Sequence, residues 1–281
     1  MPDKIALITG ASSGFGLLTT IELARTGFHV VATMRDLIRR SRLEEAAAAE
    51  HVAPNVEIRQ LDITQAETID PLIAQIVRAY GRIDVLVNNA GFAMSGFADD
   101  IALSELRRQL ETNFFGHVAM TQAVLPIMRR QGSGHIIMVS SIGGRMGQPV
   151  ISSYSASKFA LEGWSESLRL ETHSLGIRVV LVEPGAFKTD IWDRNVVVGE
   201  RALRADSPNR ERAAKFVEFV KKHVPKADAR EVGRLIARIA QDPNPKLRYL
   251  AGRDARIQLW LRRLMPWKRY EKMVSRLMGI D

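Results

Sequence analysis

The sequence predicts an α/β protein built on a doubly wound parallel sheet. Up to about residue 185, short apolar runs rich in β-branched residues alternate with longer helical patterns, which is the order of a βαβ protein. Most of these runs lack polar alternation, as expected for strands that helices cover on both faces. The first run leads directly into a glycine-rich turn and then a helix. With 281 residues, 46% of them hydrophobic, the chain is long enough for a sizeable core.

About seven strands are expected, joined by right-handed crossovers. The strand candidates are 4–9, 29–34, 56–61, 83–88, 135–140, 177–183 and 247–252. The main helical patterns span 14–26, 65–80, 102–131 and 153–175. No linker rich in Gly, Ser or Pro divides the chain, so residues 1–252 are expected to form a single domain.

The composition excludes several classes of site. The chain has no cysteine, which removes disulfides, thiolate metal sites and a cysteine nucleophile. Its six histidines include no pair at the i, i+4 spacing of a helical zinc site, so no protein-bound metal is expected. The N-terminus has no signal-peptide pattern, and no apolar run is as long as a membrane span. These features predict a cytoplasmic protein.

The net charge of +9 belongs to the C-terminal part of the chain. Residues 201–281 carry 21 Lys and Arg against 9 Asp and Glu, whereas residues 1–200 carry 19 against 22. Residues 253–281 are predicted to be a basic amphipathic extension that packs on the domain. A subunit contact, a pocket lid and peripheral contact with an anionic membrane are open alternatives for it. No nucleic-acid partner is expected, because no recognised binding motif accompanies the charge.

A tyrosine and a lysine lie one helical turn apart in "YSASK". At this spacing Tyr154 and Lys158 share a helix face, with β-carbons about 5 to 6 Å apart. A cation so close favours phenolate over phenol, which lowers the pKa of the tyrosine and suits it to proton transfer. The pair alone is equally compatible with an ordinary helix surface.

The turn "TGASSGFG" after the first strand is expected to bind a nucleotide. Its glycines permit a tight turn and a close approach of the backbone to a pyrophosphate, at the start of a helix near Phe15. The sequence lacks the G-K-[ST] ending of a phosphate-transfer loop, which disfavours ATPase chemistry. The residues expected at the phosphate are Gly10, Ser12, Ser13, Gly14, Phe15 and Gly16.

The end of the second strand indicates which dinucleotide binds. NAD-binding versions of the fold place an acidic residue near this point to hold the ribose 2′-hydroxyl, whereas here Arg35 follows Met34. A guanidinium suits a 2′-phosphate, so NADP(H) is favoured over NAD(H), which stays possible because Asp36 is adjacent. After the third strand, Asp62 and Ile63 are expected at the adenine, although Asp62 is also a candidate helix N-cap.

Four motifs, in this order, resemble those of the short-chain dehydrogenase/reductase family. They are "TGASSGFG", "NNAG" at 88–91, "SS" at 140–141 and "YSASK" at 154–158. A fifth, "EPG" at 183–185 followed by Thr189, is similar to the family's Pro-Gly turn and its threonine. The resemblance covers about residues 4–252 and implies a Rossmann fold, a nicotinamide cofactor and interconversion of a secondary alcohol and a ketone.

The resemblance implies a role for each matching residue. Tyr154 would be the general acid/base, and Lys158 would bind the nicotinamide ribose and lower the tyrosine pKa. Ser141 would bind the same substrate oxygen as Tyr154, and Asn113 would anchor a water next to the lysine. The further cofactor contacts implied are Asn89, Ala90, Gly91, Pro184, Gly185 and Thr189. A homodimer or homotetramer is implied as well.

The segments after strands four, five and six predict a hydrophobic alcohol or ketone as substrate. They contribute Met94, Met146, Phe187, Ile191 and Trp192. The segments 30–37 and 157–171 also resemble the family branch that contains hydroxysteroid and retinol dehydrogenases. An alternative function is a non-catalytic nucleotide-sensing or membrane-peripheral module on the same fold.

Overall fold

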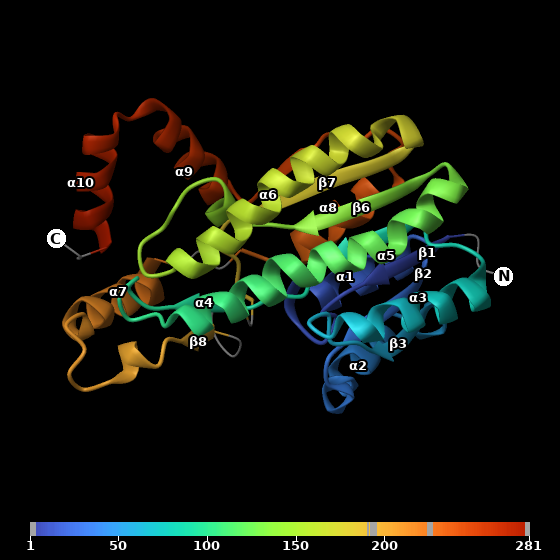
Figure 1. Ribbon diagram of the computed structural model, residues 1–281, viewed down its shortest axis with the longest axis horizontal. Helices are drawn as coiled ribbons and strands as arrows, with labels where there is room; N and C mark the ends of the chain where they lie inside the picture. The colour runs from blue at the N-terminus through green and yellow to red at the C-terminus, as the bar shows by residue number, and fades with distance from the viewer. Residues whose placement is uncertain (1–3, 190, 192–195, 224–226, 279–281) are drawn as a thin grey trace.

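The computed structural model contains a seven-stranded parallel sheet with helices on both faces (Figure 1). It describes residues 4–189, 191, 196–223 and 227–278. The strands lie in the order β3-β2-β1-β4-β6-β7-β9, and each neighbouring pair is parallel. Their bounds are β1 Ile5–Ile8, β2 His29–Met34, β3 Val56–Gln60, β4 Val85–Asn88, β6 Gly134–Val139, β7 Ile177–Pro184 and β9 Arg248–Ala251. The predicted doubly wound α/β sheet of seven strands is confirmed.

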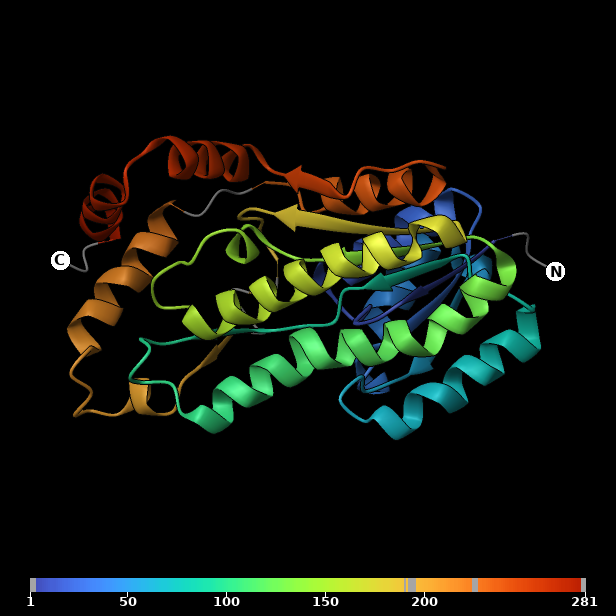
Figure 2. The same cartoon turned by 45° about the horizontal axis from the view of Figure 1, so that its top comes forward.

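The sheet is wound outward from β1 in both directions. The chain passes from β1 to β2 and β3 on one side, and then returns to β4, β6, β7 and β9 on the other. The strand order therefore reverses between β1 and β4, where the carboxyl ends of the two halves leave a crevice. The arrows of β7 (yellow) and β9 (orange-red) point to the side of the molecule where the C-terminal helices lie (Figure 2).

Two hydrophobic cores lie on the two faces of the sheet. Residues alternate between them along each strand, as Ala6 and Ile8 of β1 pack into one core while Ile5 and Leu7 pack into the other. Helices α1 (Gly14–Arg25) and α8 (Arg230–Gln241) cover the first face, with α2 (Ser41–Ala49) beside α1. Helices α3 (Ala66–Tyr80), α5 (Gly116–Gln131) and α6 (Ser152–Thr172) cover the second.

The predicted helical stretch 102–131 is confirmed as an unbroken helical run over 103–131, but its winding is not uniform. It consists of α4 (Leu103–Leu110), a π-helical turn at Glu111–Phe115, and α5. The wider turn brings the Asn113 side chain inward to the backbone of Phe92, and Gly116 then packs so closely that a β-carbon there would lie 2.7 Å from Ile63 Cδ1. Such single π turns often mark functional sites, and hydrophobic periodicity does not reveal them.

Several smaller elements at the carboxyl end of the sheet were not predicted. A second, two-stranded parallel sheet pairs β5 (Ala93–Ser95) with β8 (Val196–Val198). Helix α7 (Arg210–His223) lies beyond it, and α9 (Arg253–Leu264) and α10 (Trp267–Met278) follow β9.

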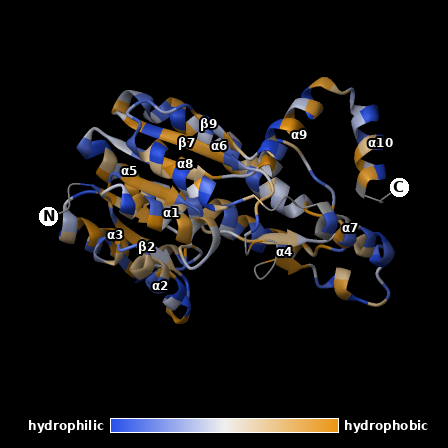
Figure 3. Cartoon of the chain, turned by 180° about the vertical axis from the view of Figure 1, so that it is seen from behind, coloured by the Kyte–Doolittle hydropathy of each residue, from blue (hydrophilic) through white to orange (hydrophobic). Residues whose placement is uncertain are grey.

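The C-terminal helices pack on the domain through a small core of their own. Ala255 and Tyr270 are buried there against Ile142 and Met146, which follow β6. Blue and orange segments alternate along α9 and α10, which extend from the body of the molecule (Figure 3). Within the part of the chain that the structure describes, no helix is both long enough and apolar enough to cross a bilayer.

Candidate functional site

The glycine turn after β1 is fixed to the end of β4 by hydrogen bonds. The Asn89 side-chain amide donates to the carbonyl oxygens of Thr9 (2.9 Å) and Gly10 (3.1 Å). In return, the Thr9 hydroxyl accepts from the backbone N–H groups of Asn89 and Ala90, each at 3.0 Å. Gly10 has a left-handed φ of 71°, and a β-carbon there would lie 2.7 Å from Ala90 Cα, so only glycine fits.

The turn presents the start of α1 to a space suited to an anion. Ser13 precedes the helix in an extended conformation without capping it through its side chain, and the first turn contains no acidic residue. The N–H groups that begin a helix have no partner within it, and they favour a phosphate there. A β-carbon at Gly14 would have no neighbour closer than Thr189 Cβ at 3.8 Å, so this side is open. The residues present therefore fit a pyrophosphate.

Arg35 lies exposed at the end of β2, as the sequence predicts. The Asp36 carboxylate accepts the backbone N–H of Ile38 at 2.9 Å, and no ion pair joins it to Arg35 among the described residues. Among the described residues the Arg35 guanidinium has no ion-pair partner, so it is available to a ligand. Asp62 accepts from the backbone N–H and the hydroxyl of Thr64. It therefore caps the turn before α3 rather than α3 itself, which begins at Ala66, while the next residue, Ile63, is buried in the core.

The "NNAG" segment and the π turn meet through Asn113. Its Oδ1 accepts the Phe92 N–H at 3.2 Å, and its Nδ2 donates to Phe92 O at 3.1 Å and Ser157 Oγ at 3.2 Å. A β-carbon at Gly91 would lie 3.0 Å from Asn113 Oδ1, which explains the glycine. His117, which the sequence analysis missed, bonds Ala90 O at 2.7 Å. Burial and the nearby Lys158 lower its pKa to about 3, so the neutral ring donates this hydrogen bond.

Tyr154 and Ser141 are brought together from α6 and the segment after β6. Tyr154 is 5% exposed and is hydrogen-bonded to Ser141. Burial raises the pKa of Tyr154 to about 12, against the opposing effect of that hydrogen bond. The Ser141 Oγ accepts the Gly143 N–H at 3.0 Å, so its own hydrogen is available for donation. At neutral pH this pair is a buried, oriented phenol with a hydroxyl beside it.

Lys158 lies one turn after Tyr154 but does not lower its pKa here. The Lys158 Nζ donates to Val139 O at 2.8 Å and lies 5.8 Å from the centre of the Tyr154 ring. The expectation that the ammonium favours the phenolate is therefore not met, because burial outweighs it and the ammonium faces the β6 carbonyl. Burial also lowers the pKa of Lys158 to about 8, while Glu162 opposes this shift.

An ion cluster of two buried glutamates and two more exposed arginines, near Lys158 on α6, was not predicted. Glu183, fully buried at the end of β7, pairs with Arg145 at 2.9 Å and with Arg248 at 3.3 Å. Arg248 also pairs with Glu162 at 3.1 Å, one helical turn after Lys158. Burial and the nearby Glu183 raise the pKa of Glu162 to about 7, although Ser140 and Arg248 act in the opposite direction. The glutamate in "EPG" was the available sequence signal, since a charged residue ending a buried strand needs a partner.

The turn after β7 is held by the first turn of α9. Gly185 N–H donates to Ala251 O at 2.9 Å, and Ala186 N–H donates to the Asp254 carboxylate at 2.7 Å. A β-carbon at Gly185 would lie 2.3 Å from Asp254 Oδ2, so the two segments touch. Asp254 is thus a further residue of the site. The turn continues from Pro184 toward Thr189, which lies beside Gly14.

The predicted substrate wall is reproduced in part. Ile191 packs beside Tyr154, Met146 is buried after β6, and Met94 is fully buried on β5. Phe187 instead lies in the core, edge-on to Phe15 with ring centres 5.6 Å apart, because the turn after β7 directs it under the glycine turn. Trp192 lies outside the described residues.

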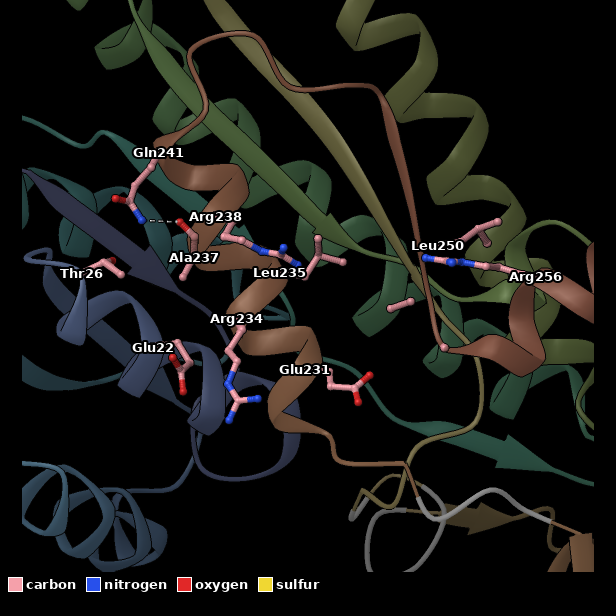
Figure 4. Close-up of a pocket in the computed structure, with 12 residues that line it drawn as sticks. Glu22, Thr26, Glu231, Arg234, Leu235, Ala237, Arg238, Gln241, Leu250 and Arg256 are labelled. Carbon is pink, nitrogen blue, oxygen red and sulfur yellow. Dashed lines mark hydrogen bonds between the residues drawn. The ribbon is translucent and has the colours of Figure 1, made fainter.

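A separate groove of about 610 Å³ lies outside this site (Figure 4). Side chains of α1, α8, β9 and α9 line it, and Arg234, Arg238 and Arg256 are its cationic residues. None of Asn113, Ser141, Tyr154 and Lys158 reaches it, so it is not the candidate catalytic site. No cluster of metal-ligating side chains occurs among the described residues.

Comparisons with known proteins identify relatives across the whole chain. Residues 4–196 match the family model described as short chain dehydrogenase. An uncharacterised oxidoreductase, YusZ of Bacillus subtilis, is 42% identical over 278 residues, covering 98% of this chain and 99% of the relative. A 3-ketodihydrosphingosine reductase of Bacteroides thetaiotaomicron is 40% identical, covering 90% and 89%. The 17-beta-hydroxysteroid dehydrogenase type 1 of Mus musculus is 37% identical, covering 89% and 74%, in line with the predicted likeness to hydroxysteroid dehydrogenases.

Solved structures agree with the fold. A short-chain dehydrogenase from Streptomyces avermitilis superposes with a TM-score of 0.77 at 32% identity, covering 96% of this chain and 97% of that one. A short-chain dehydrogenase/reductase from Burkholderia phymatum in complex with NAD gives a TM-score of 0.79 at 25% identity, covering 92% of each chain.

The raised pKa of Glu162 predicts a pH-dependent cost to stability. Between its ordinary value of 4.5 and about 7, the folded chain holds a proton that the unfolded chain releases. The free energy of unfolding should therefore fall as pH rises through this window, by up to about 3 kcal/mol relative to Glu162→Gln. Denaturant titrations of both proteins at several pH values measure the difference. Glu166→Gln is the control, because the pKa of this exposed partner of Arg248 is lowered. A constant difference between wild type and Glu162→Gln would contradict the assignment.

Proposed function

The chain belongs to the short-chain dehydrogenase family, and from that premise we propose that it interconverts a secondary alcohol and a ketone with NADP(H) as cofactor. The observation that carries the proposal is the meeting of a buried Tyr154 with Ser141, one helical turn before Lys158 on α6. A hydrophobic substrate is part of the proposal.

In the direction of reduction, Tyr154 supplies the proton. With a pKa raised to about 12 by burial, its phenol is protonated at neutral pH and donates to the carbonyl oxygen of the ketone. Ser141, whose oxygen accepts the Gly143 N–H, would turn its hydroxyl hydrogen from Tyr154 to the same oxygen, which then lies between two donors. A nicotinamide held at the site would supply the hydride. In the reverse direction the base would be the Tyr154 phenolate, formed by loss of the phenol proton, and it would take the proton of the alcohol.

Lys158 and Asn113 support the proton donor. The ammonium is fixed by the Val139 carbonyl and reaches toward the tyrosine ring, where it is placed to bind ribose hydroxyls. Because burial lowers the pKa of Lys158 to about 8, it is also able to exchange a proton near neutrality. Asn113 uses both of its polar atoms on Phe92, and its amide also donates to Ser157 of α6, so that the π turn is fixed against α6 and the segment after β4.

Arg35 supports NADP(H) as the preferred cofactor. Its guanidinium is exposed and unpaired among the described residues at the end of β2, where we propose that the adenine ribose binds. The NAD complex of the Burkholderia phymatum relative keeps NAD(H) open for the fold as a whole. The remaining cofactor contacts proposed are those of the glycine turn, of "NNAG", and of the turn from Pro184 to Thr189.

The substrate class is proposed from the walls of the site and from the relatives' names. Ile151 and Ile191 pack around Tyr154, and Met146 lies nearby after β6. Relatives are named for 3-ketodihydrosphingosine and for 17-beta-hydroxysteroids, both of them lipids. We therefore propose that the substrate is a lipid-like alcohol or ketone. We also propose that the chain assembles as a homodimer or a homotetramer. The non-catalytic alternative is disfavoured, because Asn113, Ser141, Tyr154 and Lys158 are all present, Tyr154 is hydrogen-bonded to Ser141, and Asn113 is bonded to the helix that carries Lys158.

Tyr154→Phe should abolish turnover and leave cofactor binding intact. Loss of the only proposed proton donor predicts a fall in kcat of about 10²- to 10⁴-fold in NADPH oxidation with a panel of hydrophobic ketones. Tyr270→Phe is the control, since Tyr270 is equally buried but lies against α9. If the wild type reduces a given ketone and Tyr154→Phe reduces the same ketone at the same rate, the mechanism is refuted.

Arg35→Asp should reverse the cofactor preference. Replacing a guanidinium by a carboxylate next to a 2′-phosphate predicts an NADPH Kd at least about tenfold weaker, with little change for NADH. Quenching of tryptophan fluorescence measures both constants. Arg78→Asp makes the same charge change on an exposed face of α3. An unchanged preference in Arg35→Asp would remove Arg35 from the cofactor site.

Asp254→Ala should weaken cofactor binding, although Asp254 belongs to none of the motifs shared with the family. Without the Asp254 carboxylate, the Ala186 N–H loses its acceptor and the turn beside Gly185 loosens, which predicts about a tenfold higher Kd for NADPH. Asp254→Asn, which keeps an acceptor oxygen, should restore most of the affinity. Asp242→Ala removes a similar carboxylate that caps Asn244 in a distant loop, and it should have no effect on cofactor affinity. Equal affinities in all three variants would contradict the role.

A further inference from the structure

Helix α9 carries a stripe of large apolar side chains that face solvent. Ile257, Trp260 and Leu264 are 55%, 63% and 60% exposed. Their spacing of three and four residues places them on one face of the helix. Trp267, at the start of α10, is 58% exposed beyond the end of this stripe. We call Ile257, Trp260 and Leu264 the α9 stripe.

The α9 stripe is not needed to attach the helix to the domain. The attachment uses other positions, because Ala255 and Leu259 of α9 pack against Ile142 and Met146. Asp254 adds a hydrogen bond to Ala186. Three large apolar side chains therefore stay in water although the fold does not require them, and exposed apolar side chains gathered in this way commonly mark a binding surface.

Cations flank the α9 stripe. Arg253, Arg256 and Arg263 are exposed on the same helix, and within the described ranges no ion pair is found for any of them. Near the end of α9, the guanidinium of Arg262 lies 4.8 Å from the ring centre of Trp267, the first residue of α10. The segment 253–281 has eight Lys and Arg against three Asp and Glu. Tryptophan, aliphatic side chains and arginine on one helix surface match the boundary between water and acyl chains in an anionic bilayer.

We propose that the α9 stripe docks this protein on an anionic lipid surface, with α9 lying flat in the headgroup region. A second copy of the chain is a poorer occupant. In a two-fold dimer the same patch meets itself, so Arg253, Arg256 and Arg263 would face the same three cations. Phosphate headgroups instead offer the opposite charge to every arginine.

Docking in this way places the bilayer next to the site. The attached side of α9 rests on Met146, five residues after Ser141, so the lipid surface lies about one helix diameter, ~10 Å, from that wall. A lipid-like alcohol or ketone would then enter from the membrane rather than through water. This consequence rests on the proposed function, whereas the docking itself does not.

The test is co-sedimentation of the full chain with vesicles. One set contains phosphatidylcholine and phosphatidylglycerol in equal parts, and the other contains phosphatidylcholine alone. We expect binding to the anionic vesicles, weaker binding to the neutral ones, and release by high salt. Trp260→Ser combined with Leu264→Ser should lower the affinity at least about tenfold. Arg256→Gln and Arg263→Gln should each lower it about fivefold.

The matched control is Ile38→Ser combined with Leu170→Ser, two side chains that are 88% and 78% exposed outside α9. This control should bind vesicles as the wild type does, and a cofactor titration verifies that every variant is folded. Absence of binding to anionic vesicles by the wild type would overturn the proposal. Equal binding by the α9 variants and the control would overturn it too. A dimer that the Trp260→Ser and Leu264→Ser changes dissociate, with no vesicle binding, would assign the surface to a second copy. None of these readouts depends on turnover, so an inactive enzyme would leave the docking result intact.

Discussion

The site depends above all on the hydrogen bonds between the ends of β1 and β4. Asn89 holds the carbonyls of Thr9 and Gly10, and Thr9 holds the N–H groups of Asn89 and Ala90. These bonds fix the glycine turn at the point where the strand order reverses, and they aim the start of α1 at the crevice. Thr9 is fully buried, so water does not compete with its hydroxyl. Two further hydrogen bonds tie this region to the helices. His117 of α5 bonds the Ala90 carbonyl, and Asn113 of the π turn accepts the Phe92 N–H.

Burial, more than pairing, sets the proton chemistry of the site. Tyr154, Lys158 and Glu162 lie on successive turns of α6, and in each the neutral form is favoured because the side chain is removed from water. The tyrosine is thereby held as a proton donor. The pKa of Lys158 falls to about 8 and that of Glu162 rises to about 7, so that both groups titrate near neutral pH. The glutamates are compensated by arginines from outside α6, since Arg248 pairs with Glu162 and Glu183, and Arg145 pairs with Glu183.

The sequence predicted most of the sheet because strands covered on both faces have little freedom in composition. The seven strand ranges agree with the structure to within about two residues. Of the motif residues, Tyr154 is hydrogen-bonded to Ser141, and Asn113 is hydrogen-bonded to Ser157 of the same helix. The features that the sequence did not predict have local causes. The helix 102–131 contains a π turn because Asn113 bonds the Phe92 backbone, a contact between segments about twenty residues apart that no periodicity contains. Phe187 lies in the core for a similar reason, since the path of the turn after β7 was not predictable from its apolar composition.

Helix α9 connects the proposed cofactor site with the proposed lipid-binding surface. One side of the helix packs on the domain, and the other side exposes the α9 stripe. Its first turn holds the turn after β7 through Asp254, and its attached side supports Met146 near the catalytic serine. A helix of 12 residues with its N-terminal carboxylate bonded to a backbone N–H behaves as one rigid element. A bound surface that shifts this helix would also move Asp254, which holds the Ala186 N–H and touches Gly185. Cofactor affinity and surface binding are expected to be coupled, and such coupling is reciprocal: a surface that tightens the turn after β7 is itself bound more tightly by the cofactor-loaded protein.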